Sequence, residues 1–288
     1  GINEFAARFP DALCGIITLL VLFRTGSKIA DKKFAVSWVV LYGGSLLPFI
    51  YFKSGIIDPW FNLFIFLGIY HCYLYVNSDT RRTLKIAGSA LFIGLAILTK
   101  GPVALLVFLL TAGIYLIIHK FKVRIRFIDI LVYLAVLSLV GGFWFILQIL
   151  KGNLSIIEDF FEYQIRLFRT HGAGHRGFLF YHFIVLLFGA FPASIFALPA
   201  LFGSKQDSGF RKEFFTWMLI LFWVVLILFT IVKTKIVHYS SLCYFPLTYI
   251  AAWWLCYSQT ATLRVQKLVR VLIVIIGSLL ALIIAVLT

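Results

Sequence analysis

Residues 98–102 read Leu98-Thr99-Lys100-Gly101-Pro102 and place a lysine directly before a glycine and a proline. This stretch interrupts an apolar run over residues 84–118, with Lys100 near its middle. As one helix this run would be roughly 50 Å long, against about 30 Å for the hydrocarbon core of a bilayer. Proline disrupts a helix interior but suits the first turn of a new helix. The stretch therefore predicts two membrane spans joined by a tight turn, with Lys100 held at a membrane face.

The composition of the whole chain supports a membrane protein. Hydrophobic residues make up 62% of its 288 residues and charged residues 13%, and the mean hydropathy is +1.02. Such a chain has too little polar side chain to cover the surface of a soluble domain. The net charge is +15, but the basic residues stand in short clusters between apolar segments. This pattern indicates membrane topology, and no nucleic-acid partner is expected.

Ten apolar segments are long enough, or nearly so, to cross a membrane as helices. Continuous apolar runs of this length exclude a β-barrel. We therefore expect an all-α, polytopic membrane protein whose residues 1–288 form a single transmembrane core. Because the chain opens on Gly1 and ends within an apolar run, we expect a piece truncated at both ends. The expected spans are roughly 11–26, 34–52, 60–76, 84–98, 102–118, 127–150, 178–201, 214–232, 236–257 and 268–288.

The distribution of lysine and arginine predicts the orientation. One set of alternate loops holds 17 of the 26 basic residues, and the richer set is expected in the cytoplasm. The Lys100 turn then faces outward. The nine outward basic residues gather beside short acidic or aromatic sequences. They are Arg8, Lys53, Lys100, Lys151, Arg166, Arg169, Arg176, Lys233 and Lys235.

The longest outward loop, residues 151–177, has the pattern of an amphipathic helix lying along the membrane surface. One side of this expected helix is apolar and the other is charged. The apolar side holds Ile156, Ile157, Phe160, Phe161, Ile165 and Phe168. The charged side holds Glu158, Asp159, Glu162, Arg166 and Arg169.

Two residues at expected span ends are candidates for chemistry. Lys100 can neutralise an anionic headgroup or phosphate, or it can simply end a helix and extend its ammonium toward water. Asp58 precedes Pro59 and Trp60 at the start of a span. Its plain interpretation is a helix N-cap, and its functional interpretation is an acidic group in a site.

Further candidates lie on two other outward segments. The 151–177 loop carries Arg166, His175 and Arg176, and the planar arginine fork suits phosphate. His171 and His175 are four residues apart, but the glycines between them argue against a helical metal pair. Lys233-Thr234-Lys235, followed by His238 and Tyr239, forms a short turn in which two lysines predict a shared anion.

Several short segments resemble motifs of one known family, and they occur in the same order along the chain. The chain is similar to polyprenyl-phosphate-dependent glycosyltransferases of the glycosyltransferase-C fold, in particular lipid A aminoarabinose transferases and, more distantly, protein O-mannosyltransferases. The resemblance covers nearly the whole chain. Its segments are Gly1 to Arg8, Ile57-Asp58-Pro59, Leu98 to Gly101, Phe160 to Arg166, His175-Arg176 with Phe178 to Tyr181, and Lys233 to Tyr239.

The resemblance implies an inverting transfer of a sugar from a polyprenyl-phosphate donor to a lipid, glycan or protein acceptor at the periplasmic face. It makes Lys100, Arg166, Lys233 and Lys235 candidates for holding the donor phosphate, and Asp58 a supporting acid. Glu162, His175, Arg176 and Tyr239 become candidates for substrate binding. The family's principal catalytic acid lies in the first outward loop, which is expected upstream of Gly1. Close relatives carry a metal-associated histidine where this chain has Tyr163. The resemblance therefore leaves a divalent metal ion open, with no residue assigned to hold it, and implies no other cofactor.

Two other classes of protein are compatible with the spans. A transporter or flippase of an anionic lipid or glycan would also place cations beside the membrane, but it should carry ionisable groups near the bilayer midplane. A membrane scaffold without catalytic activity would leave the outward cations unexplained. The charges of this chain lie at span ends on one side, which favours chemistry at the interface.

Overall fold

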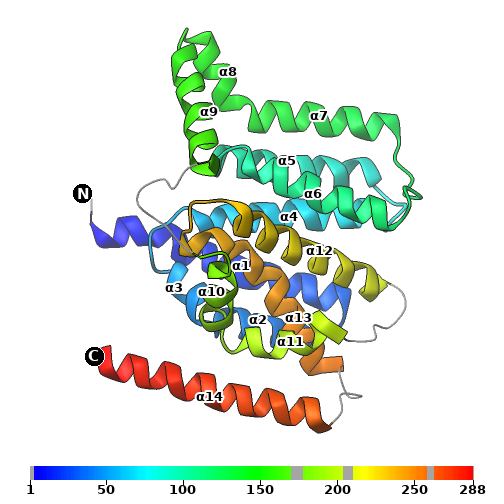
Figure 1. The fold of residues 1–288 in the computed structure, drawn as a ribbon. Helices are drawn as coiled ribbons and strands as arrows, with labels where there is room; N and C mark the ends of the chain where they lie inside the picture. The colour runs from blue at the N-terminus through cyan, green and yellow to red at the C-terminus, as the bar shows by residue number, and fades with distance from the viewer. Residues whose placement is uncertain (1–2, 170–177, 204–209, 258–262, 288) are drawn as a thin grey trace. The chain divides into compact units, whose positions relative to one another are not determined.

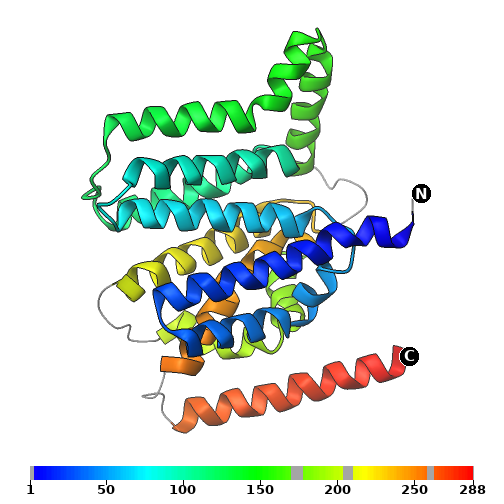
Figure 2. The same cartoon turned by 180° about the vertical axis from the view of Figure 1, so that it is seen from behind.

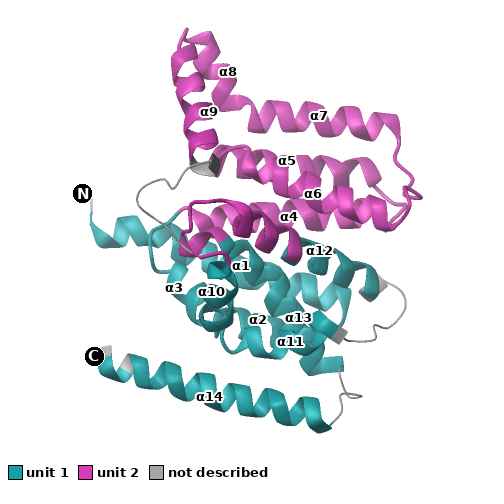
Figure 3. Cartoon of the chain, viewed as in Figure 1, with its two compact units in different colours: residues 1–56, 180–222, 240–288 teal, residues 57–179, 223–239 magenta. Residues whose placement is uncertain are grey.

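The computed structural model describes residues 3–169, 178–203, 210–257 and 263–287 (Figure 1). Within these ranges every regular element is a helix, which confirms the all-α prediction. The chain divides into two compact units, each built from separate segments (Figure 3). Unit 1 comprises residues 1–56, 180–222 and 240–288, and unit 2 comprises residues 57–179 and 223–239. The single core expected from the sequence stays a prediction.

Unit 2 is built around α5, which packs between α4 and α7; Figures 1 and 2 show these helices side by side. Short turns join the consecutive helices α4, α5 and α6, so α5 runs antiparallel to both α4 and α6. The unit contains α4 (Asp58–Val76), α5 (Arg82–Lys100), α6 (Val103–Ile118), α7 (Phe127–Gly141), α8 (Phe143–Leu150), α9 (Leu154–Arg169) and the end of α12 (Phe210–Ile231).

Small residues let the backbones of these helices approach closely. A Cβ atom on Gly68 of α4 would come within 2.6 Å of Ile93 of α5, and Ser89 donates a hydrogen bond to the Gly68 carbonyl at 2.8 Å. On the other side of α5, a Cβ on Gly94 would come within 3.0 Å of the backbone nitrogen of Gly141 in α7. These contacts fix how α4, α5 and α7 align, and therefore which of their ends meet.

The turn predicted at Gly101-Pro102 is confirmed. α5 ends at Lys100 and α6 begins at Val103. Gly101 has φ of +97°, which L side chains rarely adopt, so glycine suits this position.

Three expected spans are not continuous helices, and the sequence holds a physical reason for each break. The span 127–150 bends by 58° between α7 and α8, where Gly141 and Gly142 are adjacent. The span 34–52 divides at Gly44-Ser45 into α2 (Lys32–Gly43) and α3 (Leu46–Tyr51). The span 178–201 divides before Ala193, where Pro192 cannot continue the helix.

Unit 1 is organised around α13, whose residues from Tyr244 to Trp253 are all buried. α2 and α11 pack against it, and Trp38 Nε1 donates a hydrogen bond to Thr248 Oγ1 at 3.0 Å. α14 contacts α11 through a cluster with Ile195, Val269 and Ile276 at its centre. The unit contains α1 (Glu4–Ile29), α2 (Lys32–Gly43), α3 (Leu46–Tyr51), α10 (Tyr181–Gly189), α11 (Ala193–Gly203), the start of α12, most of the 3₁₀ helix η2 (Val237–Cys243), α13 (Tyr244–Tyr257) and α14 (Leu263–Leu287).

Several helices match the dimensions of a bilayer. Among the described residues, five are long and apolar enough to cross a membrane by themselves, and the bent pair α7–α8 makes six if it counts as one span. The other expected spans correspond to shorter or divided helices. The protein is thus a helical membrane protein, and the count of about ten spans stays a prediction.

Candidate functional site

Unit 2 brings together three of the predicted site residues, Asp58, Lys100 and Tyr239, and the first two form an ion pair. Asp58 is the first residue of α4 and Lys100 the last of α5, and these two helices run in opposite directions, so the two residues meet at one end. Lys100 Nζ donates to Asp58 Oδ1 at 2.6 Å. The Asp58 side chain is only 5% exposed and that of Lys100 is 26% exposed. Hydrogen bonds between two charged groups are short and about twice as strong as neutral ones.

The capping interpretation of Asp58 is wrong. The N-cap position of α4 is occupied by Ile57, and no side chain caps the helix there. The Asp58 carboxylate instead accepts the hydrogen bond from Lys100, which is 42 residues away along the chain. Lys100 therefore does more than end a helix, because its ammonium is held by a buried carboxylate.

Aromatic side chains surround the ammonium of this pair. The Lys100 Nζ lies 5.6 Å from the centre of the Phe61 ring and 5.3 Å from that of Tyr239, within the range of cation–π attraction. His238 Nε2 lies 4.0 Å from Asp58 Oδ2. No role was predicted for Phe61 or His238 from the sequence. A signal for Phe61 was present, because it follows Asp58 by three residues on the same helix and so shares its face.

The two lysines of the 233–235 turn have different environments. Lys235 is buried, and its Nζ donates to the carbonyl oxygens of Phe229 at 3.0 Å and Thr230 at 2.6 Å in the last turn of α12. A cation there also interacts favourably with the negative end of the helix dipole. Burial lowers the pKa of Lys235. Lys233 is exposed, and the anion shared by the two lysines stays a prediction.

The amphipathic helix expected in the 151–177 loop is present as α9. Its inner face packs against α8, with the ring of Phe160 centred 5.8 Å from both Trp144 and Phe145. A Cβ on Gly101 would lie 2.9 Å from Phe160, so α9 reaches the residue that follows Lys100. The position of α9 on a membrane surface stays a prediction.

One polar side of α9 approaches the same region. The phenol groups of Tyr163 and Tyr239 lie close enough for the charge on one of them, when it is ionised, to act on the other. The Arg166 guanidinium carbon is 5.5 Å from the centre of the Tyr163 ring. Glu162 and Arg166 are both exposed. The predicted residues His175 and Arg176 lie outside the described residues.

The site as described consists of nitrogen donors, one carboxylate and aromatic rings. In the part of the chain that the structure describes, no three His, Cys, Asp or Glu side chains are grouped so that they could hold a metal ion. A buried carboxylate that orients an ammonium beside aromatic rings is suited to binding an anion carried on an apolar or sugar-bearing molecule.

Residues 1–144 match the family model described as dolichyl-phosphate-mannose-protein mannosyltransferase. This match covers half of the chain and includes both Asp58 and Lys100. The chain belongs to this family. The match confirms the resemblance to polyprenyl-phosphate-dependent glycosyltransferases inferred from the sequence.

Curated relatives extend the similarity beyond residue 144. An uncharacterized protein of Aquifex aeolicus is 29% identical over 261 residues, which cover 88% of this chain and 56% of that protein. An undecaprenyl phosphate-alpha-4-amino-4-deoxy-L-arabinose arabinosyl transferase of Photorhabdus laumondii is 25% identical over 259 residues, covering 88% of this chain and 46% of that enzyme. The chain spans about half the length of these relatives.

Solved structures share the fold. ArnT from Cupriavidus metallidurans, in a crystal structure bound to undecaprenyl phosphate, superposes with a TM-score of 0.74 at 16% identity. The superposition covers 96% of this chain and 50% of that one. The apo structure of the same protein gives a TM-score of 0.72. The fold expected from the resemblance is thus confirmed.

Proposed function

We propose that this chain is the membrane core of a glycosyltransferase that takes a sugar from a polyprenyl-phosphate donor. The observation that carries the proposal is the Asp58–Lys100 pair, which presents an oriented ammonium beside Phe61 and Tyr239 at one end of α4 and α5. Family membership, the arabinosyl transferase relatives and the fold shared with an undecaprenyl-phosphate-bound protein support it. The acceptor is a lipid, a glycan or a protein.

Lys100 is assigned to the donor phosphate. When the bond between the sugar carbon and the phosphate oxygen breaks, its electron pair stays on that oxygen and the phosphate gains negative charge. A fixed cation at this position stabilises the charge as it develops. An ammonium has three donors, and among the described residues Lys100 uses one of them, for Asp58. The other two remain to meet phosphate oxygens.

Asp58 is assigned to positioning Lys100. Its Oδ1 accepts the short bond from Lys100, and its Oδ2 faces His238. Because this carboxylate already accepts the hydrogen bond from Lys100, we do not assign it to deprotonating the acceptor hydroxyl. That step needs a base near the acceptor, and the family resemblance assigns it to a carboxylate in the first outward loop.

The remaining site residues extend the proposal to the rest of the donor. We assign the exposed side chains of Arg166 and Lys233 to further phosphate contacts, with Lys235 adding charge from the end of α12. Glu162, Tyr239, His175 and Arg176 are assigned to the sugar or acceptor. The site faces the periplasm and the protein lies in the bacterial inner membrane, because the cytoplasmic loops carry most of the lysine and arginine.

The test is sugar transfer by the intact protein, purified in detergent, with an undecaprenyl-phosphate-linked sugar. Lys100→Ala should reduce turnover by at least about a hundredfold, the effect of removing one group that stabilises transition-state charge. Lys100→Arg should retain part of the activity. Lys151→Ala, which removes an exposed cation from the same set of outward loops, should leave turnover unchanged. Wild-type turnover by Lys100→Ala would overturn the proposal.

A second assay separates the proposal from the transporter alternative. Vesicles that contain the protein and a fluorescent polyprenyl phosphate would report movement of the lipid between leaflets. Lipid movement that depends on Lys100, together with no sugar transfer to any acceptor, would favour a flippase. Transfer without movement between leaflets supports the enzyme.

A further inference from the structure

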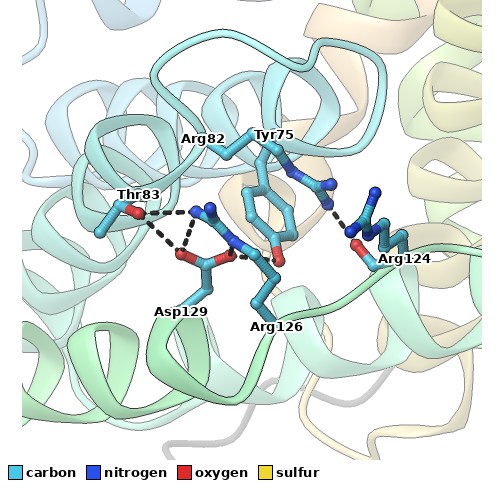
Figure 4. Close-up of polar contacts among 6 residues, drawn as sticks. All are labelled: Tyr75, Arg82, Thr83, Arg124, Arg126 and Asp129. Atoms are coloured by element: carbon cyan, nitrogen blue, oxygen red, sulfur yellow. Dashed lines mark hydrogen bonds and ion pairs between the residues drawn. The ribbon is translucent and has the colours of Figure 1, made fainter.

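A second polar cluster lies at the other end of α4 and α5, where α7 begins (Figure 4). Its centre is Asp129, whose side chain is buried. This carboxylate accepts two hydrogen bonds from Arg126, at 2.7 and 2.9 Å. It accepts two more, from Thr83 at 2.9 Å and from Tyr75 at 3.0 Å. Both oxygens of Asp129 are therefore fully used.

Arg82, in the same cluster, keeps a charge that this carboxylate does not neutralise. Arg82 is 8% exposed, and its guanidinium lies 4.6 Å from the centre of the Tyr75 ring. It donates a hydrogen bond to the Arg124 carbonyl oxygen. Its Nε is buried and has no hydrogen-bond partner among the described residues. A buried donor on a charged group without a partner is costly, so an anion that accepted a hydrogen bond from it would be stabilising.

The segment that covers Arg82 alternates basic and apolar residues. Residues 120–128 read Lys-Phe-Lys-Val-Arg-Ile-Arg-Phe-Ile, and residues 122–126 are not helical. The side chains of Lys122 and Arg124 are exposed, and so are those of Phe121, Ile125 and Phe127. Exposed cations and exposed apolar groups in one short segment suit a boundary where phosphate and hydrocarbon are both present.

We infer that Arg82, Arg124 and the 120–128 segment form a binding site for the phosphate headgroup of an anionic phospholipid. Arginine's planar fork matches phosphate oxygens, and the Arg82 guanidinium is already oriented by Tyr75 and the Arg124 carbonyl. The exposed apolar neighbours favour a lipid over free phosphate, because they can contact acyl chains. The inference does not depend on the proposed glycosyl transfer, since it concerns the opposite end of the helices.

The experiment measures retained lipid by native mass spectrometry, after the intact protein is placed in nanodiscs of phosphatidylcholine with a fixed share of phosphatidylglycerol. Arg124→Ala removes an exposed side chain and leaves the backbone carbonyl that holds Arg82. We expect it to reduce bound phosphatidylglycerol about fivefold, as one cation at an anionic surface contributes. Arg82→Gln should reduce it further. Arg24→Ala, another exposed arginine of the cytoplasmic loop set, is the matched control and should have no effect.

Two further arms make the result decisive. Phosphatidylcholine retention should be equal in all variants. Circular dichroism should show that each variant is folded. If Arg82→Gln does not fold, the result for Arg124→Ala decides the test. Excess inorganic phosphate should not displace the lipid. Wild-type retention of phosphatidylglycerol by Arg124→Ala would overturn the inference. Displacement by inorganic phosphate would overturn the lipid assignment in favour of a free anion.

Discussion

Each end of the α4–α5 pair holds a buried carboxylate bonded to a basic side chain, but the two carboxylates differ in the number of hydrogen bonds they accept. At one end the Asp129 carboxylate receives four hydrogen bonds from three side chains. At the other end, the described residues give the Asp58 carboxylate one short hydrogen bond, from Lys100, with His238 4.0 Å away. Both carboxylates are buried. The two carboxylates therefore do not differ in burial. They differ in the number of hydrogen-bond donors that contact them.

This difference indicates what each end does. A fully bonded buried network fixes one arrangement of the helices, because breaking any member leaves a costly unpaired group. An ammonium that shares a single bond with a carboxylate keeps donors for another anion. We therefore interpret the four bonds to Asp129 as the contacts that hold α4, α5 and α7 together, with Arg82 lying beside this network and not part of it. The Asp58–Lys100 pair is then the end available to the sugar donor.

Removing Asp129 should produce the largest effect on stability. Asp129→Ala leaves Arg126, Thr83 and Tyr75 without their common acceptor, and breaking a buried ionic network costs about 3–5 kcal/mol of unfolding free energy. The measurement is the thermal unfolding midpoint in detergent. Asp58→Ala, which breaks a single bond, should lower this midpoint less. An equal or larger loss for Asp58→Ala would remove the contrast between the two ends.

Asp58→Asn separates binding from turnover at the Asp58–Lys100 end. The amide has no negative charge to compete with phosphate, so undecaprenyl phosphate should bind at least as tightly as to the wild type. Turnover should fall about tenfold, because Lys100 loses the charged partner that orients it. Binding and transfer are measured on the same preparation. Loss of binding in this variant would mean that Asp58 itself contacts the ligand.

Tyr75→Phe should have a smaller effect. It deletes one of the four hydrogen bonds to Asp129 and keeps the ring beside Arg82. The expected cost is about 1 kcal/mol of unfolding free energy. Comparison of the unfolding midpoint with that of Asp129→Ala tests whether the network is shared. A loss as large as that of Asp129→Ala would mean that the tyrosine alone holds the cluster.

The smallest expected effect is on the pH dependence of stability. Burial lowers the pKa of Lys235, while lysine in the unfolded chain keeps a pKa of about 10.4. Between the lowered and the ordinary value the unfolded state binds more protons, so rising pH stabilises the folded state. The unfolding midpoint of the wild type should therefore rise with pH in this window relative to that of Lys235→Met. A difference between the two proteins that stays constant with pH would contradict the lowered pKa.

Much of the helix pattern could be predicted because its signals are local. The Gly101-Pro102 break and the apolar runs beside it specify α5 and α6 without any knowledge of their neighbours. The bend at Gly141-Gly142 and the break at Pro192 had equally local signals, but the length of the apolar runs made single spans the simpler expectation. The length of an apolar run does not change when the backbone bends within it, so run length alone could not predict these breaks.

The candidate site could be predicted only in part. Residue type and position at span ends identified Lys100 and Asp58, but 42 residues separate them, and the pairing depends on how α4 and α5 align through Gly68 and Ile93. For the same reason the two lysines at 233 and 235 looked equivalent in the sequence. Only the fold shows that one is buried against the end of α12 and the other is exposed.

The most direct test of the central claim is the equilibrium affinity of the intact protein for undecaprenyl phosphate. We expect Lys100→Ala to weaken binding by at least about tenfold, because a hydrogen bond to a charged group contributes about 1.5–3 kcal/mol. Arg126→Ala removes a cation from the Asp129 cluster, at the other end of α4 and α5. This variant should leave the affinity unchanged in protein that remains folded. Unchanged binding by Lys100→Ala, or equal losses in the two variants, would contradict the claim that the Asp58–Lys100 end is the one open to substrate.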